Sequence, residues 1–281
     1  MQLIDRKDLE NWADTYARCL RIAGGLKAMG HPKGSVVSVL CRNVPAAVEL
    51  SYAVPMTPLM LNMINTRLDA REIAYILDHG AAEVFVIDSG LADLADAALK
   101  LSKGSPAIIL VQDRQDPATA RAGWEDYEAF INRAEALRAD QTLPDSENDA
   151  VALNYTSGTT GNPKGVVYHH RGAYLNGLGN ALEWSLPWHP RYLWTLPLFH
   201  CNGWCFPWTI AAKAGVNICL RAPVAADIVQ QFSDNDVTHL CGAPIVLNLI
   251  VTELEDTGAA LNHPVEMMVA GAPPPAAVLQ R

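Results

Sequence analysis

One short stretch of the sequence combines hydroxyl, glycine and lysine residues at a density that ordinary loops lack. It reads NYTSGTTGNPKGVV over residues 154–167 and begins within an apolar run that predicts a strand. Glycine lets the backbone turn so that its amide hydrogens approach a ligand, hydroxyls donate hydrogen bonds, and lysine supplies a compact positive charge. The stretch therefore predicts a phosphate-binding loop made of Thr156, Ser157, Gly158, Thr159, Thr160, Gly161 and Lys164.

This loop differs from a Walker A phosphate loop, which needs a hydroxyl residue directly after the lysine to bind magnesium. Lys164 instead stands between Pro163 and Gly165. An ordinary turn rich in serine, threonine and glycine is the alternative that the composition leaves open. Such a turn accounts for scattered polar residues, but it explains the high density and the lysine less well.

A second candidate region, LPLFHCNGW, overlaps the end of the predicted strand YLWTL (192–196). His200 carries an imidazole, a side chain that ordinarily titrates near neutral pH, and Asn202, Gly203 and Trp204 follow it closely in the sequence. The alternative for His200 is a histidine that bonds to a neighbouring carbonyl. For Trp204 it is simple packing, since tryptophan rings bury large areas in protein cores.

Other histidines and the cysteines do not predict a metal site. His169 and His170 are adjacent, so on a strand they point to opposite faces, and local hydrogen bonding is favoured over shared ligation. The six cysteines include no CxxC pair. Cys201 and Cys205 lie near His200 but lack the second ligand pair of a structural zinc site. We therefore predict no metal ligands.

The composition is that of a folded acidic protein. Half of the 281 residues are apolar and 18% are charged, and 21 basic against 30 acidic residues give a net charge of −9. This charge opposes nonspecific attraction to nucleic acid. No apolar stretch approaches the roughly 18–20 residues that span a bilayer, and the N-terminus lacks a leader pattern. We expect a cytoplasmic protein with no nucleic-acid partner and no membrane span; the sequence indicates no oligomeric state.

Apolar runs alternate with amphipathic segments along the chain, which predicts an α/β fold with largely parallel sheets covered on both faces. Polar stretches near 112–122 and 138–149 interrupt the alternation. They suggest a first α/β subdomain over 1–145 and a second over 146–281. Strands are predicted at 35–41, 83–88, 107–111, 151–156, 192–196, 216–220, 237–240 and 265–270, and helices near 8–30, 44–54, 69–80, 91–101, 171–184, 204–213, 225–233 and 244–255.

The segment YTSGTTGNPKGV closely resembles the signature loop of the adenylate-forming superfamily, which includes acyl-CoA synthetases, luciferases and peptide-synthetase adenylation domains. The resemblance covers nearly the whole chain, through WADTYARCLRIAGGL, INTRLDAREIAYILDHG, LPLFHCNGW, VTHLCGAPIVLNLI and VAGAPPP. Within the superfamily, VVYHHRGAYLNGLGNALEW and LWTLPLFHCNGWCFPW look most like ligases of short- and medium-chain acids, including methylmercaptopropionate-CoA ligase.

The resemblance implies that a carboxylic acid attacks ATP to give an acyl-adenylate and pyrophosphate, and that CoA then displaces AMP. It implies phosphate roles, with magnesium, for Ser157, Thr159, Thr160 and Lys164, and backbone roles for Gly158 and Gly161. It places Gly271, Ala272 and Pro273 against adenine. It places His200, Asn202, Gly203 and Trp204 at the acyl pocket, where His200 controls the access of CoA. Lys164 and His200 are the expected catalytic residues.

The superfamily's pattern continues beyond the point where this sequence stops, Arg281. The continuation carries a magnesium-binding glutamate, a ribose-binding aspartate, a hinge and a domain with a catalytic lysine. We therefore expect an incomplete large N-terminal domain of an adenylate-forming enzyme. The opening strands of the family are also expected to be absent, and Pro58 stands in a turn that usually contains glycine. A non-catalytic nucleotide- or partner-binding module and a luciferase-like oxygenase remain as alternatives.

Overall fold

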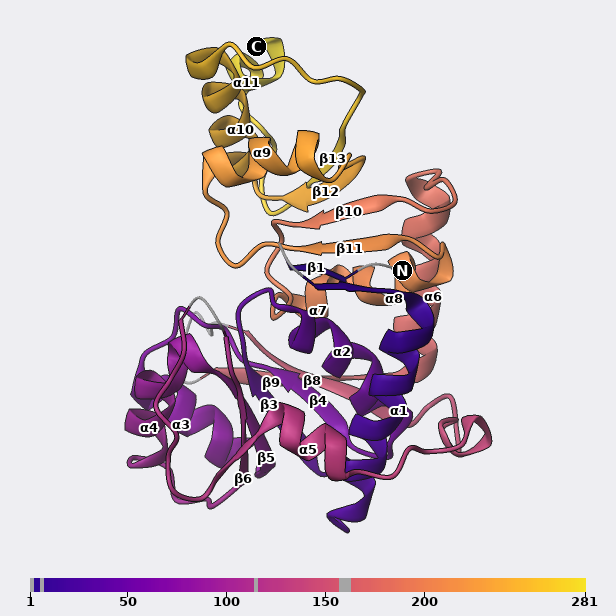
Figure 1. The fold of residues 1–281 in the computed structure, drawn as a ribbon, viewed down its shortest axis with the longest axis vertical. Coiled ribbons are helices and arrows are strands. Elements are labelled where there is room, and N and C mark those ends of the chain that lie inside the picture. The colour runs from indigo at the N-terminus through magenta and orange to yellow at the C-terminus, as the bar shows by residue number, and fades with distance from the viewer. Residues whose placement is uncertain (1–2, 6–7, 114–115, 157–162) are drawn as a thin grey trace.

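The fold contains two β-sheets that stand one above the other, with helices around each of them (Figure 1). The computed structural model describes residues 3–5, 8–113, 116–156 and 163–281. Strands alternate with helices along most of this length, and neighbouring strands within each sheet are mostly parallel. The predicted α/β class with largely parallel sheets is therefore confirmed.

The seven-stranded sheet occupies the lower part of Figure 1, in the order β7-β6-β5-β3-β4-β8-β9. All of its neighbouring pairs are parallel except β8 and β9, which form an antiparallel hairpin at one edge. Its strands are β3 (Val36–Leu40), β4 (Met60–Met63), β5 (Ala82–Asp88), β6 (Ala107–Val111), β7 (Trp124–Asp126), β8 (Ala150–Thr156) and β9 (Lys164–His169).

The six-stranded sheet lies above it, in the order β13-β12-β10-β11-β1-β2. Only β1 and β2 pair antiparallel. Its strands are β1 (Leu3–Asp5), β2 (Asp8–Glu10), β10 (Arg191–Trp194), β11 (Val216–Cys219), β12 (His239–Gly242) and β13 (Glu266–Val269).

Helices supply the crossovers that parallel strands require. Asp69 caps α3 by accepting hydrogen bonds from the backbone N–H groups of Arg71 and Glu72. The Glu72 side chain in turn accepts a hydrogen bond from the Asp69 N–H, which completes a capping box. The helices are α1 (Trp12–Ala28), α2 (Pro45–Ala53), α3 (Ala70–His79), α4 (Ala92–Leu99), α5 (Tyr127–Arg133), α6 (His170–Glu183), α7 (Cys201–Trp204), α8 (Phe206–Ala212), α9 (Ala225–Asp234), α10 (Pro244–Thr257) and α11 (Ala276–Gln280), with 3-10 turns η1 (Val54–Met56), η2 (Ser89–Leu91) and η3 (Ala139–Gln141).

One continuous apolar core joins the two sheets. Val37 and Leu61 of the seven-stranded sheet belong to the same buried cluster as Tyr192 and Trp194 of the six-stranded sheet and Phe206 of α8. Two further clusters cover the remaining faces, one against each sheet. Because the largest cluster crosses between the sheets, burial of apolar surface holds them together as one body.

Charged side chains reinforce this junction. Arg221 follows β11 in the upper sheet, and its guanidinium contacts Asp113 and approaches Asp88, at 3.8 Å, in the lower sheet. The Asp88 side chain is buried and also accepts hydrogen bonds from the backbone N–H groups of Arg42 and Gly90. The carboxyl-terminal ends of strands from both sheets are therefore tied to each other by an ion pair.

A second buried ionic group fixes α1 against α2 and α5. Glu49 of α2 is 1% exposed and accepts hydrogen bonds from Arg18 Nε of α1 at 2.5 Å and from the Tyr127 hydroxyl of α5 at 2.8 Å. Arg18 also reaches Glu128 at 2.7 Å. Burial raises the pKa of Glu49, and the hydrogen bond from Arg18 opposes that rise.

The sheets are assembled differently from the sequence-based expectation in two respects. The opening strands were expected to be absent, but β1 and β2 precede α1, and β1 pairs with β11. Strands β8 and β9 follow residue 146, yet β8 pairs with β4 of the lower sheet. The lower sheet thus contains strands from both sides of the predicted boundary between 1–145 and 146–281. The division into two subdomains at that boundary stays a prediction.

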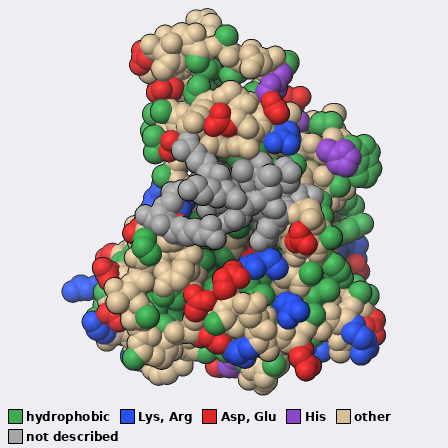
Figure 2. Space-filling view, in the orientation of Figure 1, with side chains coloured by type: hydrophobic (Ala, Val, Ile, Leu, Met, Phe, Trp, Pro, Cys, Tyr) green, Lys and Arg blue, Asp and Glu red, His purple; other side chains and the backbone are tan. Residues whose placement is uncertain are grey.

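Neither the described helices nor the face seen in Figure 2 points to a membrane or a broad basic patch. None of the helices in the described part of the chain is both long enough and apolar enough to cross a bilayer. On the face seen in Figure 2, outside the grey atoms, acidic and basic side chains are interspersed.

Candidate functional site

The predicted phosphate loop connects the two strands of the β8–β9 hairpin. Thr156, the last residue of β8, pairs with Lys164, the first residue of β9, and both are exposed. Within the described residues, Lys164 forms no ion pair with a carboxylate. A free cation beside a hydroxyl at the carboxyl end of a parallel strand suits a phosphate group, because ligands of such sheets bind at that end.

The centre of this loop is outside the described residues. It contains Ser157, Gly158, Thr159, Thr160 and Gly161, whose predicted phosphate roles therefore stay predictions. The next regular element after the loop is strand β9 and not a helix. This agrees with the sequence-based distinction from a Walker A loop, where a helix comes directly after the glycines.

The second candidate region forms a left-handed turn. Five consecutive residues, Cys201 to Cys205, have φ angles between 43° and 65°, and only Gly203 among them is a glycine. A left-handed helical conformation costs roughly 1–2 kcal/mol for each residue with a side chain. Strain of this size persists only where surrounding contacts hold it, and it is typical of functional sites.

This turn forms one wall of a pocket of 540 Å³. Cys201, Trp204 and Cys205 come from the turn, and the opposite wall comes from α6 and β9. Among the described residues, no acidic or basic side chain lines it, which suits an uncharged ligand tail. The described lining residues are Tyr168, Gly172, Ala173, Asn176, Asn180, Cys201, Trp204, Cys205, Phe206 and Met268.

Three buried polar side chains gather beside this pocket. The Tyr168 hydroxyl and the amides of Asn154 and Asn202 form no hydrogen bond of good geometry within the described structure, but the two amides lie near enough to the hydroxyl to interact with it. Burial raises the pKa of Tyr168, and these interactions with the amides of Asn154 and Asn202 oppose that rise. Because weakly paired buried polar groups are costly, a ligand that offered well-placed partners would be favoured here.

The residues predicted for the acyl pocket divide into two groups. Trp204 lines the pocket, but Asn202 and Gly203 are buried behind its wall, and His200 is exposed and absent from the lining. The role of His200 in the access of CoA therefore stays a prediction.

The segment predicted to lie against adenine follows β13. Gly271, Ala272 and Pro273 are all exposed, and Gly271 has a φ of 90° that favours glycine. The segment follows the carboxyl end of a strand of the upper sheet, which is the edge where ligands of such sheets bind. Its contact with adenine stays a prediction.

Packing against Trp194 explains why glycine occupies position 203. A Cβ atom there would lie 2.7 Å from the Trp194 ring, and φ is +54°. We expect Gly203→Ala to lower the free energy of unfolding by about 1–3 kcal/mol, measured by urea denaturation. Gly179→Ala in α6 is the control, since nothing lies within 4 Å of its added Cβ. That control should be neutral or stabilising; equal losses in both variants would contradict the explanation.

Of the paired histidines, His169 makes a local side-chain hydrogen bond, whereas the bond described for His170 comes from its backbone. His169 Nδ1 accepts a hydrogen bond from the Gly172 N–H at 2.9 Å and caps α6. The backbone N–H of His170 donates to the Asp149 carbonyl at 3.1 Å. Within the described residues, no group of three or more metal-ligating side chains is assembled.

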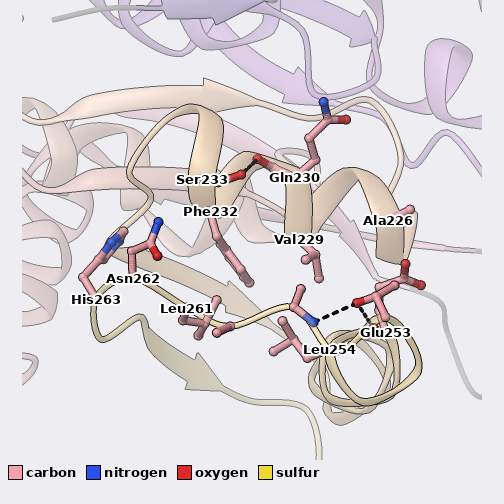
Figure 3. A pocket seen from close by; sticks show the side chains of 13 residues that line it. Ala226, Val229, Gln230, Phe232, Ser233, Glu253, Leu254, Leu261, Asn262 and His263 are labelled. Atoms are coloured by element: carbon pink, nitrogen blue, oxygen red, sulfur yellow. Dashed lines mark hydrogen bonds between the residues drawn. The ribbon is translucent and has the colours of Figure 1, made fainter.

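A smaller pocket of 270 Å³ lies between α9 and α10, far along the upper sheet (Figure 3). Val229 and Phe232 of α9 face Leu254 of α10 and Leu261 of the following loop. His263 at its rim bonds to the Val237 carbonyl at 2.8 Å. None of the predicted site residues that the structure describes lines this pocket, and it shares no described lining residue with the pocket of 540 Å³.

Several residues of the site carried no signal in the sequence analysis. Tyr168, Asn176, Asn180 and Met268 line the larger pocket although they come from three different elements. Only the fold brings them together. Asn176 and Asn180 are four residues apart on one helix, which is the single local pattern that points to a shared face.

The hairpin that carries the glycine- and hydroxyl-rich loop stands at the carboxyl end of a parallel strand, which is where ligands of α/β sheets bind. The chain belongs to the family of AMP-binding enzymes, whose model matches residues 3–281.

Curated relatives include acyl-activating and CoA-ligase proteins from plants. The chain is 44% identical over 277 residues to the probable acyl-activating enzyme 5, peroxisomal, of Arabidopsis thaliana, covering 96% of this chain and 50% of that protein. It is 40% identical to the trans-cinnamate:CoA ligase, peroxisomal, of Petunia hybrida, covering 95% and 50%. The chain thus spans about half the length of the curated relatives it matches.

Solved structures show the same fold. The N-terminal domain of FACL13 from Mycobacterium tuberculosis, in an inhibitor-bound crystal structure, matches with a TM-score of 0.80 and 25% identity, covering 95% of this chain and 64% of that one. The anthranilate CoA ligase AuaEII, in complex with anthranoyl-AMP, matches with a TM-score of 0.84 and 20% identity, covering 99% and 53%. The second likeness supports the fold alone.

Proposed function

We propose that this chain forms the nucleotide- and acyl-binding part of an AMP-forming acyl-CoA ligase. The observation that carries the proposal is the uncharged pocket of 540 Å³ in a chain of the AMP-binding family. In the first step a carboxylate attacks the α-phosphorus of ATP, which forms an acyl-adenylate and releases pyrophosphate. The thiol of CoA then takes the acyl group, with release of AMP and a proton.

The pocket supports an acid with an uncharged tail of short or medium length. Apolar groups of Trp204, Phe206 and Met268 contribute contact area, while Asn176 and Asn180 add amides. A second carboxylate would find no cation among the wall residues that the structure describes. Relatives named as ligases of acetate or butyrate and of trans-cinnamate agree with such substrates.

Lys164 and Thr156 would act on the phosphate side of the reaction. An exposed lysine without a carboxylate partner in the described structure can neutralise phosphate oxygens as charge builds up. The Thr156 hydroxyl is able to donate a hydrogen bond beside it. Together they would orient the nucleotide for attack by the acid, which is the main contribution of a protein to such transfers.

The proposal includes ATP and CoA as substrates and magnesium as a cofactor. Magnesium would neutralise phosphate charge and orient the phosphate oxygens. We assign it no ligand in this chain, because no cluster of acidic side chains is assembled within the described residues. Several relatives are named as peroxisomal, so the cytoplasmic location remains a prediction.

The test is carboxylate-dependent exchange between ATP and labelled pyrophosphate. The open reading frame that contains these residues would be expressed in full and assayed with acetate, butyrate, benzoate, cinnamate and succinate. We expect exchange with uncharged-tail acids and at least about tenfold less with succinate, which must bury a second charge. Binding of ATP without exchange for any acid would instead support the non-catalytic binding module.

A further inference from the structure

A single side chain from the loop between β3 and α2, Asn43, holds the segment that leads into the left-handed turn. Asn43 Nδ2 donates to the carbonyl oxygens of Trp194 at 2.8 Å and Leu196 at 3.0 Å. Its Oδ1 accepts a hydrogen bond from the Leu198 N–H at 2.9 Å. Asn43 is only 8% exposed, so these contacts are shielded from water.

These contacts join distant parts of the chain. Asn43 lies between β3 and α2, whereas residues 194–198 run from the end of β10 toward Cys201. The Thr195 hydroxyl adds a hydrogen bond to the Cys241 carbonyl at 2.7 Å. The approach to the turn is therefore bonded to both sheets.

The far end of the turn is also held. Asn180 Nδ2 donates to the Trp204 carbonyl at 2.8 Å, and the Thr209 N–H donates to the Cys205 carbonyl at 3.1 Å. Residues with side chains have no intrinsic preference for the left-handed conformation that this turn adopts between its two anchored ends. Its anchors must therefore set its position, and with it the position of Trp204 in the pocket wall.

We propose that Asn43 is a positioning residue of the acyl pocket, which it shapes by fixing residues 194–198 at the entrance to the turn. The inference rests on the proposed function for the role of the pocket, but the anchoring of the turn stands separately. An amide suits this task because it offers two donors and an acceptor at once. Aspartate has the same shape but no donor, and it would face two carbonyl oxygens with a negative charge.

The turn's anchoring is tested by thiol labelling. Cys205 ends the turn and is 7% exposed, whereas Cys19 in α1 is 1% exposed and lies outside it. Mass spectrometry after timed alkylation gives the rate at each cysteine. In Asn43→Ala and Asn43→Asp we expect the ratio of the Cys205 rate to the Cys19 rate to rise about tenfold or more, since lost hydrogen bonds favour local opening.

Asn62→Ala is the matched control. Asn62 is a buried amide of β4, 1% exposed, which bonds to the Ser38 hydroxyl at 3.1 Å and not to the turn. It should leave the rate ratio unchanged. Because the ratio compares two cysteines in the same molecule, it corrects for a loss of global stability. If Asn43→Ala does not fold, Asn43→Ser serves as a milder variant. An unchanged ratio in folded Asn43 variants would overturn the proposal.

A kinetic measurement then separates the two proposals. In the exchange assay of the full reading frame, Asn43→Ala should raise the KM for the acid about tenfold while the KM for ATP stays within about twofold. Equal changes in both constants would contradict a role at the acyl pocket. If the parent protein shows no exchange but the labelling ratio rises, the proposed function fails and the anchoring of the turn by Asn43 holds.

Discussion

Arg18→Ala is expected to lower the free energy of unfolding by about 3–5 kcal/mol at pH 8, which is the usual cost of leaving a buried charge unpaired. The carboxylate of Glu49 would keep only the Tyr127 hydroxyl, at 2.8 Å, among the partners described above. Urea denaturation of the folded chain, followed by circular dichroism, measures the loss.

The same variant should be less harmful in acid. Because burial raises the pKa of Glu49 above that of an exposed glutamate, the folded state binds its proton more tightly than the unfolded state. That contribution to stability is complete below the unfolded pKa and is lost as the pH rises through the folded pKa. Without Arg18 the folded pKa rises further, so we expect a smaller loss at pH 5 than at pH 8.

Arg133→Ala provides the comparison for this prediction. Arg133 pairs with Glu125 on the surface, where its side chain is 54% exposed. Exposed pairs of this kind contribute up to about 1 kcal/mol. A loss for Arg18→Ala that is no larger than that of Arg133→Ala, or that does not change between the two pH values, would show that Glu49 is not held as a buried charge.

Lys164→Ala is expected to slow pyrophosphate exchange by the full protein about ten- to 150-fold. This range corresponds to the loss of one charge-assisted hydrogen bond of about 1.5–3 kcal/mol. Lys164 is exposed at the start of β9, so its removal should leave the fold intact. Steady-state exchange at saturating acid, with circular dichroism as a check on folding, gives the result.

Lys100→Ala is a suitable control for the change in net charge. Lys100 follows α4 and pairs with Asp96 at 2.7 Å, with its side chain 74% exposed. Its exchange rate should match that of the parent within about twofold, because a screened surface charge contributes little. An undiminished exchange rate in Lys164→Ala would show that Lys164 does not contribute to phosphate binding in the reaction.

The fold class was predictable because its signals are local. The capping pair of Asp69 and Glu72 marks α3, and apolar runs mark the buried parallel strands. Strand β9 was missed because all of its residues except Tyr168 are exposed, which leaves no alternation in the sequence. Strands β1 and β2 have three residues each, and the pairing of β1 with β11 joins distant segments.

The site was only partly predictable for a related reason. Trp204 stands in a recognisable motif and lines the pocket, but Asn43 and Tyr168 are single polar residues whose roles depend on contacts across the fold. The left-handed turn could not be foreseen either. Four of its five residues carry side chains that disfavour such φ angles, so sequence preference opposes what the tertiary contacts enforce.

The exposed hairpin edge has a consequence for handling the protein. Val166 and Val167 of β9 are 49% and 54% exposed on a strand whose outer edge has no neighbour in the described sheet. Such an edge is a template on which a second chain adds a strand, and a lysine on it discourages that self-association. Lys164 would thus serve as a gatekeeper for solubility, and removing it would make the chain more prone to aggregate at high concentration.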